Sequence, residues 1–322
     1  MMEARELLTG EIATYQQVWS QHGSLFADPD WAQCFGSDIK LCGIFNGNND
    51  LIGGFLFSKS DMKGYPYHTN APFTPSIALF YHNPAENPSN RLGTDKEILD
   101  AVARFFRQFR LPIQRFCLPV KVKDMQPFNW LGFKVIPHLT YWIDLQKPET
   151  ELYANLSAKL RNNIKKAKTD GVVLRQILDY QLCEPMLMST YSRNKIGVEH
   201  EYVRNILFKF AHPGNSFAFG AFKDEEMIAI SFFLYDKHTA YYIFGGFNEA
   251  SKHEGAGAWS IWEGICYAKS KGLTLFDFEG SMIPRIEKYF RGFGGEIANY
   301  FTINRAPFLM EVILKLFKRG LF

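Results

Sequence analysis

The chain repeats itself, and this internal repeat constrains the fold more than any other feature of the 322-residue sequence. At an offset of 177 residues, the segment 42–57 aligns with the segment 219–234. Gly43 then meets Gly220, and both segments have the pattern of a strand, a polar turn and a second strand. Two similar segments of this kind indicate two similar structural units.

A longer alignment appears at an offset of 160, where residues 98–144 fall on residues 258–304 without a gap. A helical pattern, a strand, a Gly-Phe element and a final strand recur in the same order. The two offsets differ because the first half contains a longer Pro- and Asn-rich loop, 64–90, which we expect to form no regular element. The sequence therefore predicts an α+β protein with two similar domains, 1–148 and 149–322.

Composition excludes several other classes. The net charge is only +3, unlike the basic surface of a dedicated nucleic-acid binder. Neither a GxSxG nor an HExxH motif occurs, so nothing indicates a serine hydrolase or a zinc enzyme. The N-terminus has no apolar signal core. We expect a cytoplasmic protein with reduced thiols and no metal site, because the five cysteines are scattered without a CxxC pair: Cys34, Cys42, Cys117, Cys183 and Cys266.

Two acidic residues follow a strand pattern in the second half, in the segment FDFEG, 276–280. The alternation predicts that Asp277 and Glu279 share one strand face, about 7 Å apart. The first half has Cys117 and Pro119 at the aligned positions. One acid could accept a proton from an attacking amine. The alternative is a carboxylate that caps the next turn, which we favour for Asp277 and leave open for Glu279.

A glycine pair separates a strand from a helix in KHEGAG, residues 252–257. Free N–H groups at a helix N-terminus bind phosphate well. The spacing resembles the pyrophosphate loop of acetyl-CoA-dependent N-acetyltransferases, with Lys252 in the first position. Gly255 and Gly257 are therefore candidate donor-binding residues, although a tight turn would also explain them.

A basic helix is predicted over 151–172, with one apolar stripe at Leu152, Leu156, Leu160, Ile164 and Ala167. Arg161 lies on the face opposite this stripe. Lys159 and Asn163 flank the stripe, near the body of the protein. All three are candidates to contact an anion, and a solvated surface is the alternative.

The C-terminal segment 305–322 has an apolar face and carries four basic residues against one acid. Such a helix packs against its own domain or rests on an anionic membrane surface. Both interpretations remain open from the sequence.

Three segments together resemble the Fem-type peptidoglycan bridge-forming enzymes. They are the segment 132–145, the basic stretch 156–172, and Phe276-Asp-Phe-Glu-Gly280 followed by the Phe-Arg-Gly-Phe-Gly-Gly ending at 290–295. The resemblance implies two acetyltransferase-like (GNAT) domains in tandem, which agrees with the repeat. It also implies transfer of an amino acid from aminoacyl-tRNA to an amine of a peptidoglycan precursor. The wider superfamily includes other acyltransferases.

The resemblance assigns further site residues. The family's Phe-Lys pair corresponds to Phe290-Arg291 here, and arginine keeps the charge that would stabilise an oxyanion or bind a phosphate, with different geometry. Tyr191 and Arg193 match a helix motif near the family's acceptor cleft. The sequence contains no heptad-patterned insertion like the coiled-coil arm of some members.

These observations predict an acyl- or aminoacyl-transferase in which an amine attacks the donor directly. Glu279, Asp277 and Arg291 are the catalytic candidates, and the first domain is a degenerate, acceptor-side copy. Acyl-CoA or aminoacyl-tRNA would be the donor, with no covalently bound cofactor. A small-molecule or muropeptide-like amine would be the acceptor. The alternative function is a non-catalytic binding module on the same scaffold. The sequence does not determine the oligomeric state.

Overall fold

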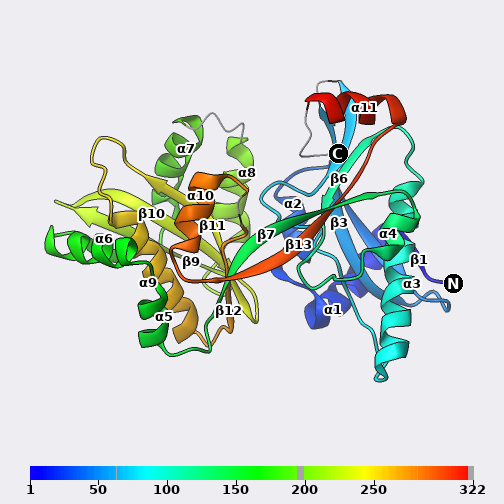
Figure 1. Ribbon diagram of the computed structural model, residues 1–322, viewed down its shortest axis with the longest axis horizontal. Helices are drawn as coiled ribbons and strands as arrows, with labels where there is room; N and C mark the ends of the chain where they lie inside the picture. The colour runs from blue at the N-terminus through cyan, green and yellow to red at the C-terminus, as the bar shows by residue number, and fades with distance from the viewer. Residues whose placement is uncertain (63, 194–198, 281, 318–322) are drawn as a thin grey trace. The chain divides into compact units, whose positions relative to one another are not determined.

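The computed structural model describes residues 1–62, 64–193, 199–280 and 282–317. The chain divides into two compact units (Figure 1). Unit 1 comprises Met1–His138 and Asn299–Phe322, and unit 2 comprises Leu139–Ala298. No helix in the described ranges is both long and apolar enough to cross a membrane.

The same order of elements recurs in the described parts of the two halves: a strand, two helices, three strands, a long helix, a strand, a short helix and a strand. The first half adds the short strand β5 before its long helix, and the second half adds α5 and α6 at its start and α11 at its end. The first half contains β1 (Glu3–Glu6), α1 (Ile12–His22), α2 (Pro29–Gln33), β2 (Ile39–Phe45), β3 (Leu51–Met62), β4 (Tyr65–Thr69), β5 (Phe80–Tyr81), α3 (Pro88–Arg107), β6 (Ile113–Cys117), α4 (Gln126–Trp130) and β7 (Lys134–Asp144). The second half contains α5 (Glu149–Asn155), α6 (Ala158–Thr169), β8 (Val173–Gln176), α7 (Glu184–Arg193), α8 (His200–Asn205), β9 (Ser216–Lys223), β10 (Glu226–Tyr235), β11 (Thr239–Phe247), α9 (Ala256–Ser270), β12 (Leu275–Asp277), α10 (Pro284–Arg291), β13 (Glu296–Arg305) and α11 (Phe308–Phe317).

The final strands of the two halves are exchanged, so the predicted division into 1–148 and 149–322 needs correction. In unit 2, β7 pairs antiparallel with β12, with Ile143 opposite Phe276. In unit 1, β13 pairs antiparallel with β6, with Ile303 opposite Phe116. Each isoleucine is buried in the core of the unit that its strand joins. The alignment of the two halves of the sequence gives only the order of the strands along the chain. It does not reveal in which of the two sheets β7 and β13 pair.

The loop 64–90 also differs from the expectation. It contains β4, which pairs antiparallel with β3 and parallel with β6. Pro66 is tolerated because it lies opposite Asp61 of β3, one residue before the pairing with β6 begins at Tyr67. The alternation of Tyr65, Tyr67 and Thr69 was a strand signal that the prolines obscured.

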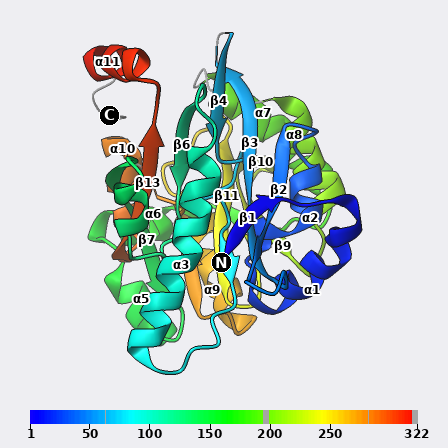
Figure 2. The same cartoon turned by 90° about the vertical axis from the view of Figure 1, so that its right-hand side faces the viewer.

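Unit 1 has the strand order β1-β2-β3-β4-β6-β13, with β5 on β3. The long helix α3, cyan in Figure 2, supplies Phe105 and Phe106 to a core that also contains Phe55, Phe57 and Phe116. Phe105, Phe106 and Phe116 pack edge to face around Phe57, so these aromatic residues belong to the core.

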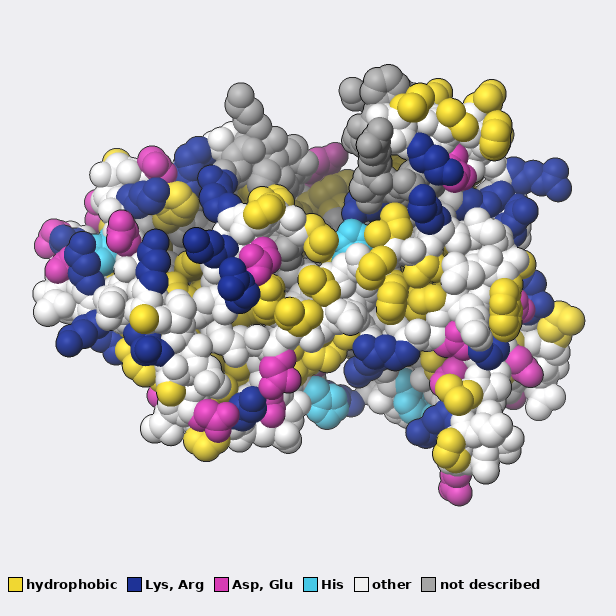
Figure 3. All heavy atoms as spheres, in the orientation of Figure 1, with side chains coloured by type: hydrophobic (Ala, Val, Ile, Leu, Met, Phe, Trp, Pro, Cys, Tyr) yellow, Lys and Arg dark blue, Asp and Glu magenta, His cyan; other side chains and the backbone are white. Residues whose placement is uncertain are grey.

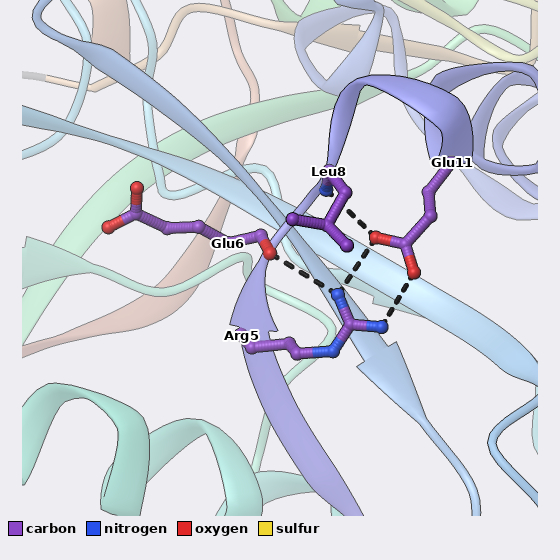
Figure 4. Close-up of polar contacts among 4 residues, drawn as sticks. All are labelled: Arg5, Glu6, Leu8 and Glu11. Carbon is purple, nitrogen blue, oxygen red and sulfur yellow. Dashed lines mark hydrogen bonds and ion pairs between the residues drawn. The ribbon is translucent and has the colours of Figure 1, made fainter.

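The first strand of unit 1 is fastened by Arg5, whose guanidinium lies over the Phe45 ring at 3.9 Å. It donates two hydrogen bonds to the Glu11 carboxylate, at 2.8 and 2.6 Å (Figure 4). The same carboxylate accepts the Leu8 N–H at 2.8 Å. The hydrogen bonds from Arg5 lower the pKa of Glu11 to about 2, so the pair stays charged at neutral pH.

Unit 2 has the strand order β7-β12-β11-β10-β9-β8. Helix α9 packs on one face, where Ile261 and Ile265 contact the Phe233 and Phe276 cluster. Tyr180 and Tyr191, which lie before and within α7, pack on Phe232 and Phe244 of the sheet. Phe232 and Phe233 are neighbours in β10, and neighbouring strand residues point to opposite faces. The sheet is therefore covered by helices on both faces.

The basic segment 151–172 is two helices, not one. Helix α5 ends at Asn155, and Ser157 caps α6 by accepting the Leu160 N–H at 3.3 Å. All five residues of the predicted apolar stripe are buried. The break does not disturb the stripe, because both helices bury it in the same unit.

Candidate functional site

Strands β11 and β12 separate part-way along their length. They pair in parallel only from Thr239 to Tyr241, opposite Leu275 to Asp277. Strand β12 ends there, and β11 continues to Phe247. The backbone of β11 beyond Tyr241 therefore has no β12 partner. Such a divergence between two parallel strands leaves peptide groups available to a ligand.

A β-bulge distorts β11 at the same place. Phe232 pairs with Phe244 and Phe233 pairs with Tyr242, so Ile243 has no partner in β10. A bulge turns peptide groups and side chains away from the regular ladder, and bulges are common next to active sites.

Asp277 holds the turn that follows β12. Its Oδ1 accepts hydrogen bonds from Thr140 Oγ1 and from the Glu279 N–H, each at 2.8 Å. Burial raises the pKa of this carboxyl, and the two hydrogen bonds oppose that rise. In the structure Asp277 therefore caps the turn that follows β12, in agreement with the role favoured for it from the sequence.

Glu279 does not share a strand face with Asp277, so this part of the prediction is wrong. Strand β12 ends at Asp277, and Glu279 has a φ of 56°, in the left-handed region. Gly280 follows with a φ of 70°, and a Cβ there would lie 2.5 Å from the Leu139 carbonyl oxygen. The turn is therefore pressed against β7, and this contact holds Glu279 in a strained conformation.

The Glu279 carboxylate is unusual in its surroundings. The residue keeps partial exposure, whereas its Oε1 is enclosed and has no hydrogen-bond partner in the described part of the chain. Burial, with a smaller contribution from the Asp277 charge, raises its pKa well above the ordinary glutamate value. An enclosed carboxyl with a raised pKa is characteristic of a general acid or base.

Glu279 and three tyrosines, Tyr191, Tyr242 and Tyr289, form a group that we call the splay cluster. Tyr191 interacts electrostatically with both Tyr242 and Glu279, and Tyr289 interacts with Tyr242. Burial raises the pKa of each phenol, that of Tyr242 to about 12. The phenols therefore stay neutral and can donate hydrogen bonds. All four residues are partly exposed.

Tyr242 and Tyr289 were not predicted from the sequence. Tyr242 looks like an ordinary strand residue in AYYIFGGF, because the bulge that redirects the strand leaves no simple sequence pattern. Tyr289 lies in the short helix α10 beside Phe290, which we had singled out. Phe290 itself is buried and stacks on Phe278 at 4.9 Å, so it is a core residue.

The two predicted glycines occupy different surroundings at the start of α9. A Cβ on Gly255 would lie 2.0 Å from the Asn163 carbonyl oxygen, so Gly255 lets α6 pack closely on α9. His253 Nδ1 already accepts the Gly255 N–H at 3.1 Å. A Cβ on Gly257, by contrast, would lie 3.8 Å from its nearest neighbour, the Tyr289 hydroxyl. Of the two, only Gly257 borders open space.

His253 has a defined tautomer as a result. Its Nδ1 is an acceptor, so Nε2 carries the proton and donates to Asp170 Oδ2 at 3.1 Å. The His253 carbonyl accepts the Ala256 N–H at 3.3 Å. In the first turn of α9, the N–H groups of Gly257 and Ala258 have no partner within the described ranges. These two N–H groups are the ones that remain for an anion.

Basic side chains gather near the end of β11. Arg193 and Lys252 lie over the Phe247 ring, at 4.2 and 5.1 Å, and Arg193 also approaches Glu249 at 3.7 Å. Lys168 lies over Trp259 of α9 at 5.0 Å. Arg193, a predicted binding residue, therefore lies close to Lys252, the first residue of the predicted phosphate-binding loop.

Three predicted binding residues lie on α6: Arg161 and Asn163 contact other helices, and Lys159 is exposed. Arg161 Nη1 donates to the carbonyl oxygens of Ala154, at 2.6 Å, and of Leu156, so it joins α6 to the end of α5. Arg161 thus stays partly exposed while it is bonded to α5, and its role as an anion contact stays a prediction. Asn163 is partly buried and contributes its carbonyl to the Gly255 contact. Lys159 is exposed.

Arg291 is not brought to Glu279. Its side chain is 60% exposed, and its Nε donates to Glu287 Oε1 at 2.8 Å. The same oxygen accepts the Tyr141 hydroxyl at 2.5 Å. Arg291 therefore belongs to a surface hydrogen-bond group on α10, and the structure does not support its assignment as a charge clamp. No group of three or more His, Cys, Asp or Glu side chains in the described residues is arranged to hold a metal.

Comparison with known proteins gives a family match within unit 2. Residues 154–291 match the model described as an acetyltransferase (GNAT) domain. The match includes β11, the splay cluster and the start of α9. No curated protein sequence matches the chain.

Solved structures share the fold over nearly the whole chain. The crystal structure of FemX has a TM-score of 0.65 at 13% identity, and the match covers 98% of this chain and 99% of that one. A tandem GNAT protein from the clavulanic acid biosynthesis pathway has a TM-score of 0.53 at 13% identity, with 95% and 99% covered. The C-terminal domain of a putative lysylphosphatidylglycerol synthetase from Agrobacterium fabrum has a TM-score of 0.56 at 12% identity, with 95% and 96% covered.

The fold is therefore that of a Fem-like tandem GNAT protein, as the resemblance implied. The GNAT match ends at residue 291, before β13. The matched residues thus lie within the predicted second copy of the repeat.

Proposed function

We propose that the chain is an acyltransferase whose reaction takes place at the splay cluster of unit 2. The observation that carries the proposal is Glu279. A strained backbone and a packed turn place its enclosed, unpaired carboxylate oxygen where β11 and β12 separate. Strain of this kind persists only where the surrounding structure enforces it, and it clusters at active sites.

The proposed reaction is a direct attack by an amine on the acyl carbonyl of an activated donor. The new C–N bond forms as the bond from the carbonyl carbon to the donor's sulfur or oxygen breaks. Glu279 accepts the proton that the amine loses. A neutral phenol of the cluster, Tyr191, Tyr242 or Tyr289, donates a proton or hydrogen bond to the leaving group. Peptide N–H groups of the bulged strand β11 stabilise the developing oxyanion.

The donor carries phosphate groups. The free N–H groups of Gly257 and Ala258, together with Lys252 and Arg193, form the part of unit 2 best suited to bind them. Acyl-CoA and aminoacyl-tRNA both meet this requirement, and the GNAT match favours acyl-CoA. For the acceptor we propose an amine on a cell-envelope or polysaccharide precursor. The likeness to FemX and to a putative lysylphosphatidylglycerol synthetase supports that choice.

The test begins with donor binding. A thermal-shift screen of the full chain with acetyl-CoA, longer acyl-CoAs and aminoacyl-tRNA identifies the donor. Transfer to a panel of amines, including a UDP-linked muropeptide, is then followed by thiol release or by transfer of a labelled amino acid.

Glu279→Gln should lower kcat by about 10²- to 10⁴-fold and leave the donor-induced thermal shift unchanged. Glu201→Gln removes an exposed carboxylate of α8 and is the matched control. Arg291→Ala should change kcat by less than about threefold, because its partner is Glu287 rather than the site. Unchanged turnover of Glu279→Gln would sink the site assignment. Donor binding without transfer by the wild-type chain to any amine would instead indicate a binding module.

A further inference from the structure

Helix α11 of unit 1 has an apolar face that the described chain does not cover. Phe308, Leu309 and Leu316 are 79%, 74% and 69% exposed, and Val312 and Ile313 are also exposed. At about 100° per residue, these five side chains occupy a continuous arc of about 140°. Figure 3 shows this surface as hydrophobic side chains on α11, with basic side chains nearby.

A different arc of the same helix makes the contact with unit 1. Met310 and Leu314 pack against Ile113, Tyr65 and Tyr67. The remaining narrow arc holds Glu311 and Lys315, which form an ion pair at 2.7 Å. An amphipathic helix of a globular protein turns its polar side to solvent. In α11 the widest apolar arc faces outward instead, while the helix is already anchored by its other apolar side.

The sequence that forms and follows this helix is net basic. The C-terminal segment 305–322 contains Arg305, Lys315, Lys318 and Arg319 against the single acid Glu311. Arg110 and the 71% exposed Leu111 lie just before Ile113, which is the residue beneath Leu314. An outward apolar arc bordered by Lys315, in a net basic segment, matches an anionic lipid surface, into which such helices insert parallel to the bilayer.

We propose that α11 docks the protein on an anionic membrane surface, with Phe308, Leu309, Val312, Ile313 and Leu316 inserted among the lipid headgroups and Lys315 contacting lipid phosphates. The proposal goes beyond the acyl transfer proposed above and does not depend on it.

Vesicle co-sedimentation of the full chain tests the proposal. Wild-type protein should bind phosphatidylcholine vesicles that contain phosphatidylglycerol at least about tenfold more tightly than pure phosphatidylcholine vesicles, and added salt should weaken the binding. Leu309→Ser/Leu316→Ser should reduce the partition by at least about tenfold, because both side chains are apolar anchors.

Leu178→Ser is the matched control, because Leu178 of unit 2 is an 83% exposed leucine outside any helix or strand. It should bind vesicles like the wild type. The single variant Leu309→Ser serves if the double variant does not fold, and circular dichroism checks each variant. Equal vesicle binding by the α11 variant and the wild type would overturn the proposal. So would a wild-type dimer that Leu309→Ser/Leu316→Ser converts to monomer, since a second copy would then cover the face.

Discussion

Replacing each of the two glycines at the start of α9 by alanine should have opposite effects on stability. The Cβ of Gly255→Ala would lie 2.0 Å from the Asn163 carbonyl oxygen and 3.0 Å from the Ala167 Cβ. An ordinary contact is about 3.5 Å, so α6 and α9 would have to separate locally by about 1.5 Å. Overpacking of this kind costs about 1–3 kcal/mol.

Gly257→Ala is the matched control, in the same turn and with the same chemical change. Its Cβ would lie 3.8 Å from the Tyr289 hydroxyl, which is an ordinary contact. Alanine is the better helix former by up to about 1 kcal/mol. The variant should therefore be as stable as the wild type or slightly more stable. It should raise the KM for the donor, because the methyl group narrows the space beside the free N–H groups.

Thermal unfolding followed by circular dichroism measures the difference. For a unit of this size, each kcal/mol corresponds to about 2–4 °C in Tm. Gly255→Ala should thus lower Tm by about 2–12 °C, and Gly257→Ala should leave it unchanged or raise it by up to about 4 °C. If Gly255→Ala keeps the wild-type Tm but loses donor binding, the packing explanation is wrong, and Gly255 belongs to the donor site after all.

Two further predictions concern charged residues. Glu279 has a higher pKa in the folded state than in the unfolded chain, so the folded state holds its proton to higher pH and stability falls as pH rises above the ordinary glutamate value of about 4.3. Glu279→Gln should therefore be more stable than the wild type at neutral pH. The difference in free energy of unfolding between the two should shrink as pH falls towards 4, at a slope of at most about 1.4 kcal/mol per pH unit. Urea denaturation at several pH values measures it, and a difference that does not change with pH would contradict the raised pKa. Arg161→Ala should lose about 1 kcal/mol of stability, because it breaks two hydrogen bonds to the end of α5. Lys159→Ala, at an exposed position, is the control and should change stability by less than about 0.5 kcal/mol. An unchanged Tm for Arg161→Ala, together with a raised KM for the donor, would indicate that Arg161 binds the donor.

The regular parts of the fold could be predicted because they follow periodicity. The stripe from Leu152 to Ala167 repeats at helical spacing, and every member is buried. The repeated order of strands and helices was visible because each element keeps its own hydrophobic pattern. The exchange of β7 and β13 was not visible. Ile143 and Ile303 are equally apolar, and either strand could satisfy either sheet edge.

The positions of long polar side chains were harder to predict for a different reason. Arg161 and Arg291 each have several rotatable bonds, so helix phase alone does not fix where their guanidinium groups lie. In the structure both find acceptors close by in the chain, at the end of α5 and at Glu287 respectively. A basic residue can thus match a family motif in sequence and still be engaged locally.

The two acids after β12 show how one turn gives similar residues different chemistry. In an extended strand, Asp277 and Glu279 would lie side by side on one face and share one environment. The left-handed conformation at Glu279 ends that equivalence. Asp277, still in the strand, has its carboxylate bound by Thr140 and by the Glu279 N–H. Glu279 is turned out of the strand and keeps an enclosed oxygen without a partner. The hydrogen bond that satisfies the first acid therefore fixes the position of the second. In the reaction that we propose, Asp277 positions Glu279 rather than touching the substrate.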